Sequence, residues 1–381
     1  MPIRVLELRS VWGFGGGPEK TILLGAAAAH ARFAVCVCYL RDARDTAFQV
    51  HDLARQLGVD YREILERHSF DPRILRSLRR LTREGRFDIV HSHDYKTDVL
   101  AWLVARLERV TPLATAHGWS GNSTWRERRL YYPLDRWCLT RFPRVIAVSP
   151  EIRDVLAASG VPGERMTVLL NGVDPDTFRR DRARVVRARE QMGFAAADFV
   201  IGGLGRLEPI KRFDLLIDAV AQVRRAHPSV QLVIAGDGSQ RSALEEAADR
   251  LIPGACRFLG QVRDVIEVHH ALDCFVQSSD YEGTSNALLE AMAMETPIVA
   301  TDVGGTGAVT RADVDGLLVP RGDSAGLADA IRRTVEDRPA TSDRVRSSRI
   351  RAETTLSFRE RTRTLEAIYE ELHVSRASDA R

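Results

Sequence analysis

The sequence has little net charge, few cysteines and no long uninterrupted apolar segment. Its 55 Lys+Arg and 52 Asp+Glu leave a net charge of only +3, which excludes a polycation that coats nucleic acid. The longest apolar stretch, residues 21–40, is interrupted by His30 and Arg32, so it does not predict a membrane-spanning helix. The first eight residues are too short and too charged for a signal peptide, and we expect a first buried strand there.

The five cysteines predict neither a disulfide framework nor a cysteine-based metal site. Their number is odd and no Cys-x-x-Cys occurs. Three of them, Cys36, Cys38 and Cys274, fall in apolar strand-like runs, where cysteine behaves as a small buried hydrophobic residue. We therefore expect a reduced, cytoplasmic protein without a protein-bound metal.

Lysine is nearly absent, since only Lys20, Lys96 and Lys211 occur and the other basic residues are arginines. The charge is also unevenly distributed: residues 1–180 carry +7 and residues 181–381 carry −4. This asymmetry predicts two halves with different binding partners.

Short apolar runs alternate with helical patterns along the whole chain, which predicts two doubly wound α/β domains. The expected strands are mostly continuous apolar runs, typical of parallel sheets covered on both faces. They are residues 3–8, 34–40, 87–91, 113–116, 145–148 and 167–170, then 199–204, 230–235, 256–259, 274–277, 297–300 and 317–319. The expected helices include 72–84, 97–108, 212–226 and 285–294.

The predicted domains are residues 1–172 and 190–355, joined by a polar linker over 173–189. Residues 357–374 have the apolar spacing of an amphipathic helix that packs back on one of the domains. Because open parallel sheets bind ligands beyond the carboxyl ends of their strands, we expect a site in the cleft between the two domains.

Two glycine-containing loops follow predicted strands and have the composition of anion sites. The first, residues 13–21, lacks the full P-loop pattern but brings backbone N–H groups and a helix start beside a strand. The second, residues 202–212, places Arg206 and Lys211 at the start of a helix. Fixed cations at a helix N-terminus suit a diphosphate leaving group. A flexible turn in the first loop and a solvated basic turn in the second remain alternatives.

The most informative segment is residues 280–292, in which two glutamates flank a helix start. Glu282 follows a predicted strand, and Glu290 lies within the following, largely apolar helix. A buried glutamate requires a partner, and its two oxygens can accept from both hydroxyls of a vicinal diol. An ordinary helix residue is the alternative for Glu290.

Glu282-x7-Glu290, followed by the runs 297–305 and 315–319, resembles the retaining glycosyltransferases of family 4, which have the two-domain GT-B fold. The interdomain segment 171–178 and the runs 235–238 and 258–260 also resemble segments of this family, and they occur in the same order. The histidine-containing runs 91–93 and 115–118 also match, so that the resemblance covers almost the whole chain. The chain departs from the family at Glu295, where a small residue is usual, and at residues 306–308, where a glutamate is often found.

The resemblance implies a role for each site residue. Arg206 and Lys211 would bind the donor diphosphate, Glu290 the ribose hydroxyls and Glu282 the hydroxyls of the transferred sugar. His117 would lie near the reacting sugar, with a structural histidine as the alternative. The further donor-binding residues implied are Gly16, Gly17, Gly205, Gly236, Arg263, Gly283, Thr284, Ser285 and Asn286.

The implied reaction is transfer of a hexose from a nucleotide diphosphate sugar to an acceptor hydroxyl with retention, as in polysaccharide, glycolipid or natural-product biosynthesis. A UDP-sugar is favoured and a GDP-sugar comes second. The resemblance implies no metal or other cofactor. The Asp-x-Asp at 174–176 falls in the interdomain segment and is discounted as a metal motif. A nucleotide-sugar 2-epimerase or a non-catalytic nucleotide-binding protein of the same fold remains open, and the scarcity of lysine weakens a pyridoxal-dependent phosphorylase.

Acceptor identity is less constrained than donor identity. The basic residues between 62 and 86, and residues 125–132, where arginines alternate with Trp and Tyr, suit an anionic lipid headgroup or a lipid diphosphate. A solvated arginine-rich face is the alternative. No nucleic-acid recognition motif is present, and the oligomeric state is open. The expected location is the cytoplasm, with the inner face of the membrane as a peripheral site.

Overall fold

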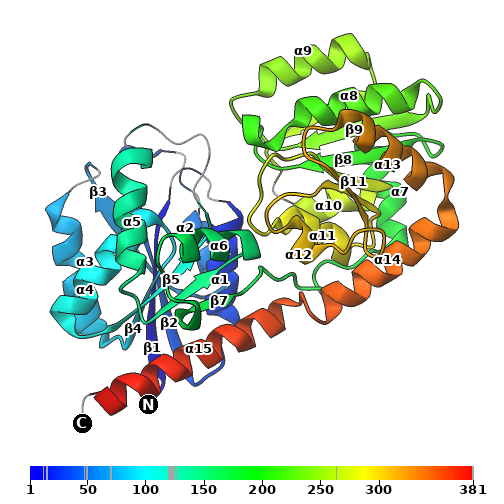
Figure 1. Cartoon of the computed structure of the whole chain (residues 1–381). Helices are drawn as coiled ribbons and strands as arrows, with labels where there is room; N and C mark the ends of the chain where they lie inside the picture. Colours follow the sequence, from blue (N-terminus) through cyan, green and yellow to red (C-terminus); the bar gives the residue numbers. More distant parts are fainter. Residues whose placement is uncertain are drawn as a thin grey trace. The chain divides into compact units, whose positions relative to one another are not determined.

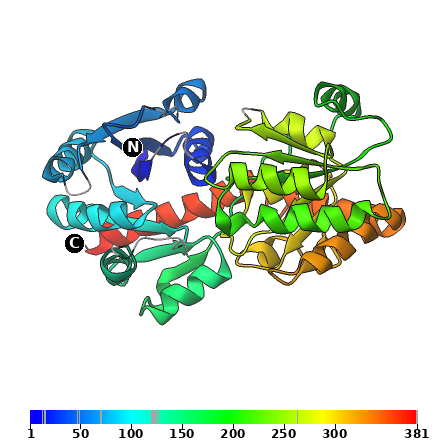
Figure 2. The same ribbon diagram turned by 90° about the horizontal axis from the view of Figure 1, so that it is seen from above.

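The computed structural model describes residues 1–11, 13, 16–46, 48, 50–68, 71–118, 125, 127–262 and 264–379. They form two compact units, Met1–Leu170 with Arg361–Arg381, and Asn171–Glu360. Each unit is a parallel sheet with helices on both faces (Figures 1 and 2). No helix in the described ranges has the length and apolar character needed to cross a lipid bilayer.

The first unit contains a seven-stranded sheet in the order β3-β2-β1-β4-β5-β6-β7. The strands are β1 (Ile3–Val11), β2 (Phe33–Asp42), β3 (Asp60–Glu66), β4 (Ile89–Ser92), β5 (Thr111–Ala116), β6 (Arg144–Ala147) and β7 (Met166–Val168). The helices are α1 (Gly17–Ala28), α2 (Val50–Gln56), α3 (Pro72–Gly85), α4 (Tyr95–Glu108), α5 (Tyr132–Leu139) and α6 (Pro150–Ala158). A π-helical turn, Glu127–Tyr131, precedes α5.

The second unit contains a six-stranded sheet in the order β10-β9-β8-β11-β12-β13. The strands are β8 (Phe199–Leu204), β9 (Val230–Ala235), β10 (Cys256–Gly260), β11 (Cys274–Gln277), β12 (Ile298–Thr301) and β13 (Leu317–Val319). The helices are α7 (Arg182–Gln191), α8 (Phe213–Arg224), α9 (Arg241–Leu251), α10 (Val265–Ala271), α11 (Asn286–Ala293), α12 (Thr306–Val309), α13 (Ser324–Glu336) and α14 (Arg338–Glu353).

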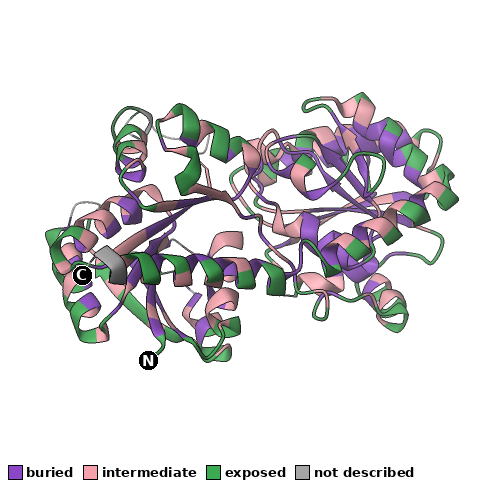
Figure 3. Cartoon of the chain, turned by 60° about the horizontal axis from the view of Figure 1, so that its bottom comes forward, coloured by how far each residue is buried: buried purple, intermediate pink, exposed green. Residues whose placement is uncertain are grey.

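The C-terminal helix α15 (Phe358–Asp379) begins in the second unit and belongs to the first from Arg361 onward. Its apolar side, with Leu365, Ile368, Tyr369 and Leu372, packs on one face of the first sheet. Buried and exposed residues alternate along α15 with the period of an amphipathic helix (Figure 3). The predicted helix over 357–374 is therefore present, with its apolar residues buried.

The strands were mostly predicted, with one exception. β3 did not appear among the expected strands because four of its seven residues are charged and it lies at the sheet edge. The predicted linker also differs from the structure. Residues 173–189 lie within the second unit, where Arg180 donates to the backbone oxygens of Leu272 (2.7 Å) and His269 (3.2 Å). The segment includes most of α7, which packs on α10.

Candidate functional site

Each sheet has one point where the strand order changes direction, and the candidate residues follow the strands at these points. In the first unit the change lies between β1 and β4, and in the second between β8 and β11. At such a switch point the adjacent βα loops diverge to opposite faces, which leaves a crevice beyond the carboxyl ends of the strands. Lys211 and Glu282 lie after β8 and β11, and Gly16 and His93 lie after β1 and β4.

Lys211 and Glu282 form an ion pair. Lys211 ends a single helical turn after β8, and its Nζ lies 2.6 Å from Oε1 of Glu282. The Ser279 hydroxyl donates to the same oxygen at 2.6 Å. These three residues line a small pocket beside β11, in which the Glu282 carboxylate is only 9% exposed. The sequence singled out the lysine and the glutamate separately, and the structure brings them together.

The N-terminal part of the segment from Gly283 to Glu290 is fixed by hydrogen bonds. Gly305 N donates to the Glu282 carbonyl (3.1 Å), and Asn171 Nδ2 donates to the Thr284 carbonyl (3.2 Å). Ser285 is the N-cap of α11, with its hydroxyl accepting from Leu288 N. The first backbone N–H groups of α11 and its positive dipole end are therefore held at the switch point.

Glu290 lies on the buried side of α11. It is 8% exposed, and its Oε2 lies 3.7 Å from Nε2 of the fully buried His269. Glu290 is therefore not an ordinary surface residue of the helix, because its carboxylate is largely buried.

Arg206 is exposed immediately after Gly205, and no ion pair or hydrogen bond joins its side chain to another residue in the described ranges. Its guanidinium is therefore available to an anion. Arg263 lies outside the described residues.

Gly205 and Gly236 have backbone conformations that favour glycine, and at Gly236 the backbone of Gly205 also leaves no room for a side chain. Their φ angles, 154° and 141°, are in the region that favours glycine. A Cβ on Gly236 would lie 1.8 Å from the Gly205 carbonyl oxygen. The structure therefore gives Gly236 a packing role that the sequence did not indicate, between the loops that follow β8 and β9.

The end of β1 and the start of α1 are joined by an ion pair that the sequence did not predict. Arg9 Nε lies 2.5 Å from Oε1 of Glu19, whose Oε2 accepts from the N–H of Gly16 at 2.6 Å. Burial acts to raise the pKa of Glu19, but Arg9 and these hydrogen bonds hold it below its usual value. The Gly16 N–H, expected to be open to a phosphate, is thus bound by Glu19, and Gly17 begins α1. The spacing of Gly16 and Glu19, at the N-cap and N3, was a signal for this bond.

His117 lies at the end of β5, with its Nε2 3.3 Å from Nδ1 of His93. Burial, followed by Arg9 and neighbouring histidines, holds the pKa of His117 well below its ordinary value. The imidazole is therefore neutral near pH 7. The two histidine-containing runs flagged in the sequence thus meet in space.

Among the described residues, one group has the composition of a metal site: Glu7, His91 and His93, all buried. Glu7 is hydrogen-bonded to His93 and Tyr369. His91 is hydrogen-bonded to Tyr369 and Thr115, and His93 also to His117. Because these bonds already engage the ligand atoms, a cation would have to displace them.

The two departures from the family pattern have local structural consequences. Glu295 follows α11 with a φ of 54°, a conformation in which the more usual glycine carries no strain. Thr306 belongs to the segment in which the family often has a glutamate. Its Oγ1 accepts a hydrogen bond from Nε2 of Gln277, at the end of β11, at 2.9 Å.

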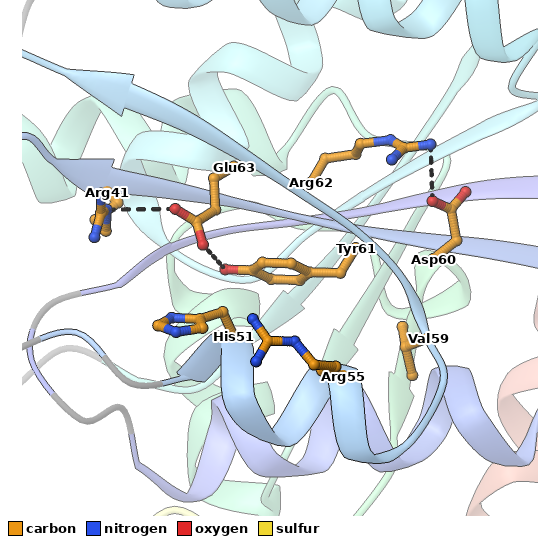
Figure 4. A pocket seen from close by; sticks show the side chains of 8 residues that line it. All are labelled: Arg41, His51, Arg55, Val59, Asp60, Tyr61, Arg62 and Glu63. Carbon is orange, nitrogen blue, oxygen red and sulfur yellow. Dashed lines mark hydrogen bonds and ion pairs between the residues drawn. The ribbon is translucent and has the colours of Figure 1, made fainter.

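A separate surface pocket lies between β3 and α2 of the first unit (Figure 4). It contains none of the predicted site residues. Its cations are paired locally, with Arg41 3.4 Å from Glu63 and Arg62 3.1 Å from Asp60. The pocket therefore does not concentrate charge of one sign.

Two family models match the chain, one on each half. Residues 15–177 match the model described as Glycosyltransferase Family 4, and residues 198–337 match Glycosyl transferases group 1. The provisionally named glycosyltransferase EpsD of Bacillus subtilis strain 168 is 33% identical over 282 residues, covering 70% of this chain and 73% of that protein.

A second relative is the UDP-Gal:α-D-GlcNAc-diphosphoundecaprenol α-1,3-galactosyltransferase of Escherichia coli. It is 27% identical over 70% of this chain and 71% of its own length. Among solved structures, Anabaena HepE in complex with UDP-glucose superposes with a TM-score of 0.85 at 23% identity, covering 97% of this chain and 99% of that one. At that identity the superposition shows the fold.

Proposed function

We propose that this chain, which belongs to glycosyltransferase family 4, transfers a hexose from a UDP-sugar to an acceptor hydroxyl with retention of the anomeric configuration. The observation that carries the proposal is the Lys211–Glu282 pair beside the N-terminus of α11 at a sheet switch point. The choice of UDP is supported by the donor in the E. coli galactosyltransferase's name and by the UDP-glucose complex of HepE.

In the proposed donor complex, Arg206 and Lys211 bind the diphosphate and neutralise the charge that develops as it leaves. Glu290 accepts from the ribose hydroxyls, and the N–H groups of residues 283–286 contribute the positive end of the α11 dipole.

Glu282 is suited to bind a hydroxyl of the transferred sugar. Among the described residues, Lys211 and Ser279 donate side-chain hydrogen bonds to Glu282, and both bonds are made to Oε1. Its Oε2 therefore retains the capacity to accept from a hydroxyl. The carboxylate keeps Lys211 ion-paired until the diphosphate, with its greater charge, competes for the ammonium group.

The chemical step follows from this arrangement. The bond between the anomeric carbon and the phosphate oxygen breaks, the acceptor oxygen bonds to the same face of the oxocarbenium-like centre, and the acceptor proton passes to the leaving phosphate. Cationic side chains and helix N–H groups supply the charge stabilisation, so that the proposal involves no metal and no covalent sugar–enzyme intermediate.

Thermal melting with UDP, GDP, ADP and their sugars tests the donor assignment. A ligand at 100 times its Kd stabilises the native state by about 2.7 kcal/mol, or about 5–10 °C for a unit of this size. We expect this shift with UDP and UDP-sugars only. No shift with any nucleotide contradicts the proposed function. Formation of a different nucleotide sugar in the absence of any acceptor would identify a 2-epimerase. Binding of UDP without turnover of UDP-sugars across a panel of acceptors would identify a non-catalytic binding protein.

We also propose an acceptor on a membrane surface, with the protein peripheral at the cytoplasmic face. Leu130, Leu134 and Trp137 are exposed on one side of the α5 region, at 56%, 46% and 44%. The Arg141 guanidinium lies 3.5 Å from the centre of the Trp137 ring. Exposed apolar side chains beside arginines suit insertion among anionic headgroups. The lipid diphosphate in the name of the E. coli relative supports this acceptor class.

Vesicle flotation tests the membrane proposal. We expect the wild type to bind vesicles containing 30% phosphatidylglycerol. Leu134→Ser/Trp137→Ser should bind about tenfold less, because two exposed apolar side chains that would enter the lipid surface are lost. The control Ile350→Ser removes an equally exposed apolar residue from α14 and should leave binding unchanged. Wild-type protein that stays with the unbound fraction would refute a lipid-surface site.

A further inference from the structure

Glu7 lies under α15 at the centre of a buried hydrogen-bond network. Burial acts to raise the pKa of Glu7, but His91 and His93 hold it well below its usual range, so that the carboxylate is ionised. An ionised carboxylate can only accept hydrogen bonds. Tyr369 accordingly donates its hydroxyl to Oε1 at 2.6 Å, and the buried Arg361 guanidinium supplies a favourable opposite charge.

The proton on His93 is fixed by this carboxylate. His93 Nε2 contacts Oε2 of Glu7, so Nε2 must carry the hydrogen. Burial is the main reason that the pKa of His93 falls to about 4, and the ring is therefore neutral. A neutral imidazole has one N–H only. Nδ1 of His93 is consequently an acceptor.

The same reasoning fixes His117. Its Nε2 lies 3.3 Å from the accepting Nδ1 of His93, so Nε2 of His117 carries the hydrogen. His117 is neutral, and its Nδ1 must therefore carry a lone pair. The ring follows the carboxyl end of β5, and open parallel sheets bind ligands at this edge.

His91 contacts the same carboxylate, with its Nδ1 3.2 Å from Oε2 of Glu7. Its Nδ1 lies 2.8 Å from the Tyr369 hydroxyl and its Nε2 lies 2.7 Å from Thr115 Oγ1. Since Tyr369 donates to Glu7, its hydroxyl oxygen accepts from Nδ1 of His91.

We propose that Glu7 and His93 are positioning residues that hold His117 as the Nε2–H tautomer, so that its Nδ1 accepts a hydrogen bond from a hydroxyl of the sugar at the reaction centre. The sugar contact rests on the proposed function, whereas the tautomer is a property of the free protein. The order Glu7–His93–His117 resembles other sites in which a carboxylate fixes the tautomer of a functional imidazole.

Two variants of His93 test this inference. Leucine removes the acceptor from His117, whereas asparagine places its Oδ1 near the position of the imidazole Nδ1. We expect His93→Leu to lower kcat about 10- to 100-fold with little change in KM for the nucleotide sugar. His93→Asn should recover most of that loss. The control His227→Leu removes a histidine that is hydrogen-bonded to Glu336 in the other unit and should leave kcat unchanged.

Nitrogen-15 NMR of the nucleotide-free wild type measures the tautomer of His117 directly. This measurement does not depend on whether the His93 variants fold. We expect His117, identified by loss of its signals in His117→Asn, to carry its proton on Nε2. Protonation at Nδ1, or an unchanged kcat in folded His93→Leu, would overturn the inference. Failure of the proposed function is recognised separately, because the wild type would then show no nucleotide-dependent thermal shift.

Discussion

Lys211→Met is expected to lower kcat about 10²- to 10³-fold, because it removes one fixed cation from the position where the leaving diphosphate develops charge. The methionine keeps most of the length of the side chain, so that packing beside β11 is largely retained. Steady-state kinetics with saturating UDP-sugar measure the effect, and thermal melting verifies that the variant is folded.

Lys96→Met is a matched control for this substitution. Lys96 is also ion-paired with a glutamate, Glu66, and its side chain is 18% exposed compared with 21% for Lys211. We expect its kcat to stay within about threefold of the wild type. Similar losses in the two variants would mean that lysine at position 211 has no special part in the chemistry.

Gly236→Ala is expected to lower the free energy of unfolding by about 2–5 kcal/mol. An added Cβ would lie 1.8 Å from the Gly205 carbonyl oxygen, and the residue would have to keep a φ of 141°. Overpacking costs about 1–3 kcal/mol and the backbone conformation adds about 1–2 kcal/mol. Urea-induced unfolding measures the change.

Gly254→Ala separates the two costs. Gly254 also has a positive φ, 72°, but no atom lies within 4 Å of an added Cβ. We expect a loss of only about 1 kcal/mol there. Equal destabilisation of the two variants would show that the contact between the loops after β8 and β9 is unimportant.

The sequence was sufficient to predict the sheets because buried parallel strands are continuous apolar runs. Twelve strands were expected and each has a counterpart, whereas β3 was missed because a charged edge strand has no such signature. Most of α7 fell within the supposed linker for a similar reason, since Ala188 is its one buried residue and arginines dominate the rest.

The candidate donor residues could be located because βα units place every loop after a strand at the same edge of the sheet. Contacts between distant segments could not be located in this way. Tyr369 and Glu7 are 362 residues apart in the sequence, and no local pattern predicts their hydrogen bond. The Lys211–Glu282 pair, 71 residues apart, is also determined by tertiary structure alone.

Calorimetric titration of UDP into the wild type and Glu290→Ala tests the donor site most directly. Glu290 lies within the second unit on the buried side of α11, and the proposal assigns it to the ribose hydroxyls. Loss of hydrogen bonds to a charged group costs about 1.5–3 kcal/mol, or about 10- to 150-fold in Kd. We predict one UDP bound per wild-type chain and at least tenfold weaker binding to Glu290→Ala. Equal Kd values for the two proteins, or no heat of binding with the wild type, would contradict a nucleotide-sugar site at this switch point.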